Sequence, residues 1–422
     1  MPRFGDGDGG RCSVTIYCGI DWAAQHHEVA IVDDAGTVLA SRRIEENAAG
    51  VTALLTLLAK HAQANAGESV AVDVAIETGR GLLVSAVRAA GHRVYEINPK
   101  VSNRYRDRYA VSGSKSDRGD ALVLAHLLRT DRDRHRPMPA DSDQVRALGV
   151  LARAQQDAVW SVLGDAGRLR AVLWEFYPAA LQAFPNLHIA SAVTVLAAAP
   201  TPGAAAQLSE ADLRRLLHAA RYHAPRDLPG KLHRIFTSPQ VRQPPAVEAA
   251  MGQVVTAIVR TMAATVTSIR ELEKALDEQF SQHPDAEILR SLPGLGVVLG
   301  ARVLGEFGDD PTRFADAASR RAYAGTAPIT RASGKSRVVL VRRARNKRLG
   351  DACRWWAFQA TQRSPGAKAY YQQRRAAGDG HEAALRRVAN KLLGQLHHCL
   401  IHRVLYDEDQ AWGAQPPAEH VA

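Results

Sequence analysis

Cysteine is scarce in this sequence. The four cysteines among its 422 residues, Cys12, Cys18, Cys353 and Cys399, lie far apart and form no C-x-x-C pair. This spacing gives no disulfide framework and no zinc ribbon. We therefore expect a reducing, cytoplasmic setting.

Long hydrophobic runs are also missing. No stretch approaches the ~18 consecutive apolar residues of a membrane-spanning helix, and the segment from Met1 to Arg11 is rich in Gly and Asp. The sequence predicts neither membrane insertion nor secretion. It has no GxxxxGK[ST] loop and no GxGxxG after a strand pattern, so nucleotide-driven chemistry has no support.

What remains is the composition of an ordinary folded protein. Hydrophobic residues make up 46% and charged residues 23% of the chain, which fits neither wholesale disorder nor a fibrous repeat. Because one domain usually has roughly 100–200 residues, we expect two or three folding units.

Acidic residues are absent from one strongly basic segment. The net charge is +11 and the pI is about 9.7, and between Ala317 and Gly350 there are ten basic residues and no acid. This excess indicates a polyanionic partner such as nucleic acid, the alternative being a solvated basic surface. The ten residues, here called the basic strip, are Arg320, Arg321, Arg331, Lys335, Arg337, Arg342, Arg343, Arg345, Lys347 and Arg348.

Residues 14–137 have the pattern of a mixed α/β domain. Helical patterns cover Ala48 to Ala64 and Gly81 to Ala90. β-Branched runs predict five strands, at Val14–Ile20, Glu28–Val32, Thr37–Ser41, Val70–Ile76 and Arg93–Ile97. A three-strand meander extended by parallel strands is the order of the ribonuclease H-like fold, although a generic α/β sheet also fits.

Residues 138–283 are predicted to be helical. One long pattern runs from Asp143 to Phe176 and a second, with near-heptad spacing, from Val247 to Phe280. We interpret the two as an antiparallel coiled-coil pair or arm that serves as scaffold and subunit contact. Between them, Ser209 and Asp212 could start a helix as a capping-box variant.

Residues 284–405 are predicted to form a mainly helical domain, with disordered tails at 1–13 and 406–422. Two apolar runs flank Pro293-Gly294-Leu295-Gly296, and this segment resembles a helix-hairpin-helix. Gly294 and Gly296 could bring backbone N–H groups close to a phosphate. An ordinary tight helical turn is the alternative.

Four carboxylates are candidates for metal-dependent chemistry. Asp21 follows the first predicted strand and Glu77 the fourth, so both would emerge at the same edge if these strands are parallel neighbours. Asp117 and Asp120 lie at i and i+3, at the start of a predicted helix at Ala121–Arg129. Carboxylates are the ligands that hard divalent cations prefer, so we expect Mg²⁺ or Mn²⁺. Nearby bases suited to a nucleic-acid strand are Lys100, Arg104, Lys115 and Arg118.

Two further candidates lie in the C-terminal part. Ser333 precedes Gly334 and Lys335, where a serine can sit exposed on a turn, but a serine nucleophile needs activation. From the residues alone, the simpler interpretation is that Lys335 and Arg337 bind phosphate. The same role is expected for Arg342, Arg343 and Arg345. His398 and His402 could ligate a metal, although a helix turn facing water explains them better.

The sequence as a whole resembles the DEDD transposases of the IS110 insertion-sequence family, the bridge-RNA-guided DNA recombinases. The motifs GIDWA, AIETG, SGSKSDRGDALVLAHLL, LRSLPGLGVVLGARVLGEFGDDPTRF and RRAYAGTAPITRASGKSR carry the resemblance. It covers roughly residues 14–130 and 286–405, with the motifs in the family's order.

The resemblance implies a RuvC-like, ribonuclease H-fold domain with the acidic tetrad Asp21, Glu77, Asp117 and Asp120. It also implies a transposase domain in which Ser333 attacks DNA and holds it as a phosphoserine. A noncoding bridge RNA would pair with donor and target double-stranded DNA, and a dimer or tetramer would join one protomer's tetrad to another's serine. Such an enzyme would be cytoplasmic and nucleoid-associated.

The sequence departs from the family pattern in two places. The segment from Pro178 to Gln243 is longer than expected, and the run after SGK reads Arg345-Asn346-Lys347-Arg348. Two other functions stay open, a RuvC-like structure-specific nuclease without a covalent serine and a basic nucleic-acid scaffold.

Overall fold

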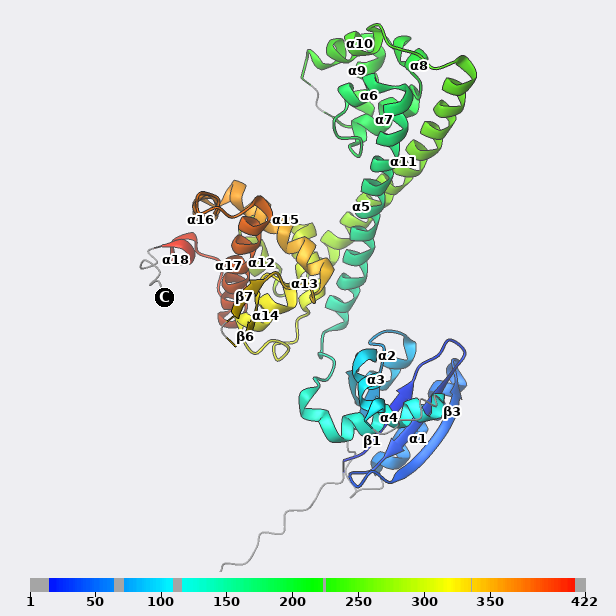
Figure 1. The fold of residues 1–422 in the computed structure, drawn as a ribbon, viewed down its shortest axis with the longest axis vertical. Coiled ribbons are helices and arrows are strands. Elements are labelled where there is room, and N and C mark those ends of the chain that lie inside the picture. The colour runs from blue at the N-terminus through cyan, green and yellow to red at the C-terminus, as the bar shows by residue number, and fades with distance from the viewer. Residues whose placement is uncertain (1–14, 64–71, 109–115, 223–224, 335, 414–422) are drawn as a thin grey trace, which may run out of the picture. The chain divides into compact units, whose positions relative to one another are not determined.

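The computed structural model describes residues 15–63, 72–108, 116–222, 225–334 and 336–413 (Figure 1). The chain divides into two compact units, Met1–Pro139 and Ala140–Ala422. The predicted tail at 1–13 lies outside the described residues.

The first unit is built on one five-stranded sheet with the order β3-β2-β1-β4-β5. β1, β2 and β3 pair antiparallel, whereas β4 pairs parallel with both β1 and β5. The prediction of a three-strand meander extended by parallel strands is confirmed. The strands are β1 (Tyr17–Asp21), β2 (His26–Val32), β3 (Val38–Glu45), β4 (Asp73–Ile76) and β5 (Arg93–Glu96).

Helices cover both faces of this sheet. Cys18 and Ile20 face the side covered by α1 (Ala48–Gln63) and α2 (Leu82–Ala89). Tyr17, which alternates with them, packs on the side covered by α3 (Pro99–Asp107) and α4 (Asp117–Asp131). Because side chains alternate along a strand, Asp21 belongs to the same face as Tyr17.

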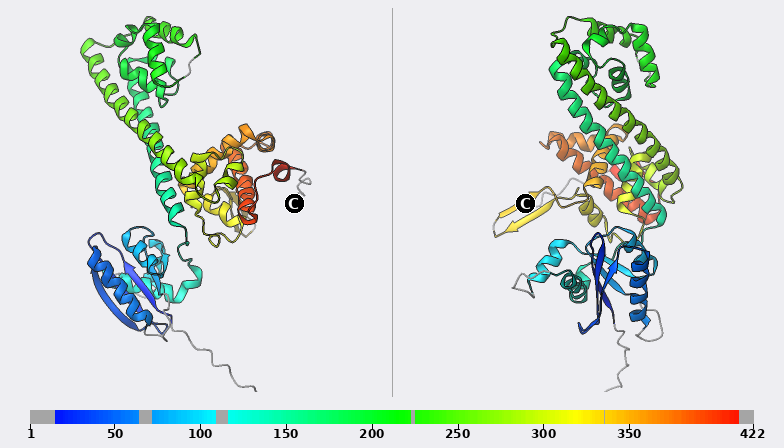
Figure 2. Two further views of the ribbon diagram at one scale, coloured as in Figure 1. Left: turned by 180° about the vertical axis from the view of Figure 1, so that it is seen from behind. Right: turned by 90° about the vertical axis from the view of Figure 1, so that its right-hand side faces the viewer.

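The second unit begins with two long helices. α5 (Asp143–Phe176) and α11 (Pro245–Ser281) lie side by side and run in opposite directions (Figures 1 and 2). Both helices were predicted, and so was the capping box of Ser209 and Asp212. The segment between them folds around one end of the pair as α6 (Pro178–Ala183), α7 (Ala190–Ala198), α8 (Pro202–Ala206), α9 (Glu210–Ala219) and α10 (Leu228–Thr237).

α11 is apolar over much of its length. Among the described residues it is the one helix long and apolar enough to cross a membrane, judged by length and composition alone. Val255, Val259 and Met262 are buried against the small helices, and Leu276 and Phe280 belong to a second core. Packing within the chain therefore uses much of the seam that the sequence suggested for subunit contact.

The rest of the second unit is helical apart from one hairpin of β6 (Ile329–Ser333) and β7 (Ser336–Leu340). Trp356 is fully buried in its core. The described part of the predicted C-terminal tail includes a short helix, and Trp412 of this helix packs against Tyr370. The helices are α12 (Ala286–Ser291), α13 (Val297–Phe307), α14 (Ala317–Ala324), α15 (Lys347–Arg363), α16 (Pro365–Ala376), α17 (His381–His402) and α18 (Glu408–Trp412).

Candidate active site and nucleic-acid surface

Asp21 and Glu77 lie next to each other at one edge of the sheet. Asp21 is the last residue of β1, and Glu77 directly follows β4. The two strands are parallel neighbours, with Ile20 opposite Ile76, so both carboxylates emerge where the strands end.

The first turn of α4 brings Asp117 and Asp120 to the same face. A Cβ on Gly19 would lie only 2.0 Å from the carbonyl oxygen of Ala121, so α4 packs directly on β1 two residues before Asp21. Ser116 caps the helix by accepting a hydrogen bond from Gly119 N, and Asp120 is buried. The helix begins at Asp117, four residues before the predicted start.

α3 connects the strand end to α4. Ser102 Oγ donates a hydrogen bond to the Glu77 carboxylate. One turn later, an Arg106 guanidinium nitrogen lies 2.5 Å from Asp120 Oδ1. Two of the four predicted acids are therefore held by neighbouring side chains of one helix.

Sequence reasoning missed a fifth carboxylate, that of Glu28. It is buried, lies opposite Asp21 in the β1–β2 register, and accepts a hydrogen bond from Arg43 Nε at 2.6 Å. This hydrogen bond raises the pKa of the exposed Arg43, with a smaller contribution from the charge of Asp117. A charged residue inside the apolar pattern HEVAIV was the available signal.

The donor chemistry at this edge suits a hard divalent cation, because the acids offer only oxygen ligands. Within the part of the chain that the structure describes, however, no three His, Cys, Asp or Glu side chains gather closely enough to hold a metal ion. The same finding covers His398 and His402, whose ring centroids lie 4.4 Å apart with the ring planes tilted by 48°, at exposed positions of α17.

The predicted bases of this unit lie at its surface. Lys100 and Arg104 on α3 and Arg118 on α4 are exposed. Lys115 lies outside the described residues.

Ser333 lies at the end of a hairpin that has no core of its own. It pairs with Ser336 across the turn, and Gly334 adopts φ +55°. Every described residue of β6 and β7 except Ile329 is exposed, and Figure 2 shows the hairpin projecting from the helices of this unit. The predicted turn is confirmed, but the strands were not predicted, and Lys335 lies outside the described residues.

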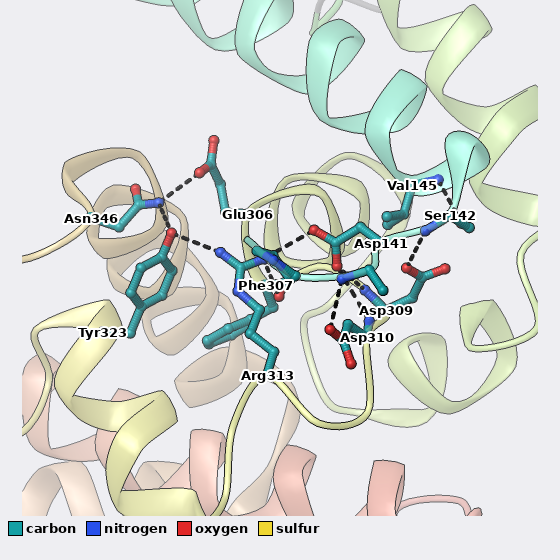
Figure 3. Close-up of polar contacts among 12 residues, drawn as sticks. Asp141, Ser142, Val145, Glu306, Phe307, Asp309, Asp310, Arg313, Tyr323 and Asn346 are labelled. Atoms are coloured by element: carbon teal, nitrogen blue, oxygen red, sulfur yellow. Dashed lines mark hydrogen bonds and ion pairs between the residues drawn. The ribbon is translucent and has the colours of Figure 1, made fainter. Parts of the chain in front are cut away.

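The base of the hairpin is closed by Tyr323 and Asn346. Asn346 N donates to Tyr323 O at 3.0 Å. Asn346 Nδ2 donates to Tyr323 Oη at 3.1 Å and to Glu306 Oε2 at 2.6 Å. The same asparagine caps α15, because its Oδ1 accepts from Leu349 N. These contacts fix both ends of the segment that carries Ser333 (Figure 3).

A second layer of contacts ties this base to Asp141, two residues before α5 begins. Arg313 donates to Tyr323 Oη at 3.2 Å and to Phe307 O at 2.7 Å, and it also approaches Asp141. Asp141 accepts from the backbone N–H groups of Asp309 and Asp310 (Figure 3). Sequence reasoning gave none of these residues a structural role, although an Asn directly before a helical pattern is a recognisable cap signal for Asn346.

The basic strip does not act as one surface. Arg320 is buried over the rings of Phe307 and Phe314, at 5.1 and 4.9 Å, and burial lowers its pKa to about 10. Arg348 is 2.8 Å from an oxygen of Asp157 and lies over Trp160. In contrast, the arginines of the hairpin and of the segment just after it make no ion pair with another described residue. They are Arg331, Arg337, Arg342, Arg343 and Arg345.

The Pro293–Gly296 turn lies partly against protein. Gly294 has φ +78°, and a Cβ there would lie 2.8 Å from Ala360 N of α15. Trp356 Nε1 donates to Pro293 O at 3.0 Å. Gly296 N-caps α13, and a Cβ at Gly296 would meet nothing within 4 Å, so Gly296 is the glycine of this turn with space beside it.

Two transposase family models match the chain. A model of the DEDD type matches residues 18–178, which include the four predicted acids. A model described as the transposase IS116/IS110/IS902 family matches residues 286–372, which include the Ser333 hairpin.

Relatives from insertion elements extend over nearly the whole chain. The mini-circle putative transposase for IS117 of Streptomyces coelicolor is 51% identical over 95% of this chain and 97% of its own length. The IS900 uncharacterized 42 kDa protein of Mycobacterium paratuberculosis is 28% identical, covering 93% of this chain and 97% of its own. An IS110 uncharacterized 43.6 kDa protein of Streptomyces coelicolor is also 28% identical, over 95% and 98%. The chain therefore belongs to the IS116/IS110/IS902 family of transposases, enzymes that act on DNA.

Proposed function

We propose that this protein is an RNA-guided DNA recombinase that moves an insertion element by using four carboxylates and a serine nucleophile. The observation that carries the proposal is the position of Asp21 and Glu77 at adjacent parallel strand ends, with the first turn of α4 packed on the same face. The meander-plus-parallel strand order supports a ribonuclease H-like domain, and the family resemblance supports the proposal that this domain is RuvC-like.

The proposed metal ligands are Asp21, Glu77, Asp117 and Asp120, with Mg²⁺ or Mn²⁺ as the cation. Bound metal would stabilise the negative charge that develops on the attacking and leaving oxygens. The chain's own residues prepare the site: Ser102 orients Glu77, and Arg106 neutralises Asp120, whose charge would otherwise be repelled by the neighbouring acids.

Ser333 is the proposed nucleophile. Its Oγ forms a bond to the scissile phosphorus while the bond from phosphorus to one deoxyribose oxygen breaks, and the serine proton passes to that oxygen. The phosphoserine keeps one phosphodiester bond for each one broken, so strands can be rejoined without an external energy source. The exposed hairpin end gives this hydroxyl the access that such an attack requires.

Donor and target DNA and a noncoding bridge RNA are the proposed partners. DNA binding follows from the family, whereas the guide RNA rests on the sequence resemblance. The exposed arginines around the hairpin and the bases on α3 and α4 offer two surfaces for phosphates.

We propose a dimer or tetramer with composite active sites, and α5 and α11 as a coiled-coil arm. The acids belong to one compact unit and Ser333 to the other. Val247 and Val254 of α11 and Trp174 of α5 stay exposed on the arm and are available for subunit contact. Mixing inactive Ser333→Ala and Asp21→Ala proteins should restore part of the recombination activity. If hetero-oligomers form but never exceed either parent, the sites are built within one chain.

The decisive experiment traps the covalent intermediate. A nicked suicide substrate should form a protein–DNA adduct with the wild-type chain and none with Ser333→Ala. DNA cleavage without an adduct would favour a metal-dependent nuclease. Undiminished rearrangement after Asp21→Ala would remove the carboxylates from the chemistry altogether.

A further inference from the structure

A small cavity lies beside the base of the Ser333 hairpin, where the start of α15 meets α17. Its volume is 180 Å³, and its lining includes none of the four acids and no residue of β6 or β7. Its lining includes Arg345, Lys347, Gly350, Arg354, Glu382 and Arg386.

The charges around this cavity are unbalanced. Arg354 donates two hydrogen bonds to Glu382, at 2.7 and 2.6 Å, and these lower the pKa of that carboxyl. Asp351, the other acid of the lining, accepts from Gln156 at 2.9 Å. Arg345 and Lys347 make no ion pair with any described residue, and Arg386 has only its longer-range attraction to Glu382.

Two glycines set the position of Arg345. Gly325 has φ +75° at the C-cap of α14, and a Cβ there would lie 2.0 Å from Arg345 Cδ. A Cβ on Gly350 would lie 3.1 Å from Arg345 Nε. The arginine therefore lies against backbone on two sides beside the cavity. Lys347 is the first residue of the 17-residue helix α15, whose N-terminal dipole adds positive potential.

The size and charge together select the ligand. Pockets for drug-sized ligands have volumes of roughly 300–1,000 Å³, so 180 Å³ is too small for a nucleoside and suits one tetrahedral anion. Arg345 and Lys347 have no counter-ion among the described residues, and their positive charges repel those of the other lining bases. We propose that this cavity binds a single phosphodiester group of a nucleic-acid backbone and so anchors the strand beside the serine hairpin.

This inference rests on the proposed function, and the bound strand is either DNA or guide RNA. Holding one phosphate at the fixed end of the hairpin limits where the strand can run relative to its exposed end. Arg345 and Arg386 are therefore positioning residues rather than members of the reacting set.

The test measures the salt dependence of binding by the full-length protein. The probes are a 40-base-pair DNA duplex and a separate hairpin RNA of equal length. Arg345→Gln combined with Arg386→Gln should reduce the log–log salt slope by about 0.9 on DNA, or by about 0.7 if the contact is to single-stranded RNA. The matched control is Arg260→Gln combined with Arg270→Gln, which removes two exposed charges from α11 and should leave both slopes unchanged.

The outcomes separate the cavity from the proposed function. A change on one probe identifies the bound strand, and unchanged slopes on both, or an equal loss with the α11 control, overturn the inference. If the cavity variant lowers a slope although the wild-type chain forms no Ser333 adduct, the cavity stands and the proposed function fails. If the adduct forms and the slopes stay unchanged, the proposed function stands and the cavity is no phosphate site.

Discussion

Replacing Asn346 should separate the stability of the hairpin base from its role in catalysis. Its Oδ1 caps α15, and its Nδ2 donates to Glu306 and Tyr323 (Figure 3). Loss of a cap costs about 1 kcal/mol, and each of the two hydrogen bonds contributes about 0.5–1.5 kcal/mol. Asn346→Ala should therefore destabilise the second unit by about 3 kcal/mol. Asn346→Ser keeps a capping oxygen and should cost about 2 kcal/mol.

Tryptophan fluorescence during urea unfolding measures this loss selectively. Five of the six tryptophans lie after residue 140, so the signal reports almost entirely on the second unit. Ser209→Ala is the matched control, because it removes the cap of α9 among the small helices far along the chain. It should cost about 1 kcal/mol, because Ser209 Oγ accepts from Asp212 N and donates to the Asp212 carboxylate.

The functional readout is the rate at which the Ser333–DNA adduct forms. Both Asn346 variants should slow it by about tenfold, the factor expected when 1.4 kcal/mol of positioning is lost, while Ser209→Ala should leave it unchanged. An Asn346→Ser protein with the wild-type rate would refute the argument that the Tyr323–Asn346 closure positions the serine. So would an equal loss in the Ser209 control.

Three further predictions concern the acids, the arginines and the packing of α4. Removing the charge of any tetrad acid should abolish most of the recombination activity and the Mg²⁺-induced rise in melting temperature, while the protein stays folded. The variants are Asp21→Asn, Glu77→Gln, Asp117→Asn and Asp120→Asn. Full recombination activity in two of these four variants would contradict the assignment. Replacing Arg331, Arg337 and Arg343 by Gln should flatten the DNA salt slope by two to three units. Arg320→Gln should instead lower the melting temperature, because that side chain is buried. Gly19→Ala should cost about 1–3 kcal/mol in the first unit by overpacking, measured by circular dichroism. Gly164→Ala on α5, where a Cβ meets nothing within 4 Å, should instead stabilise the protein by about 0.5–1 kcal/mol.

The first unit could be predicted well because its information is local. Alternation in β1 separates Cys18 and Ile20 from Tyr17, and a strand pattern followed by an acid at Asp21 and at Glu77 needs only neighbouring parallel strands to form an edge. What the pattern could not give was α3 as the link, because Ser102 and Arg106 contact acids from two other elements.

The hairpin was missed for a different reason. The run Val338-Val339-Leu340 has the composition of a strand, and a two-residue connection containing glycine is a hairpin signal, but the arginines on either side give the segment the composition of an exposed basic loop. The basic strip illustrates the same limit. Nothing local distinguishes Arg320 from Arg331, and only the positions of Phe307 and Phe314 make the first a core residue.

The two proposed chemistries rest on supports of different stiffness. The acids follow a sheet on which α4 packs closely, and α3 contacts two of them, Glu77 through Ser102 and Asp120 through Arg106. Ser333 lies on a two-stranded hairpin that is exposed along almost its whole length, and an isolated hairpin of this kind is marginally stable in water. Its rigidity comes from the base, where Asn346 and Tyr323 close the segment and a phosphate beside Arg345 would add a second attachment. Attack by the serine would thus depend on a bound strand that restrains the hairpin, which makes cleavage conditional on correct nucleic-acid engagement.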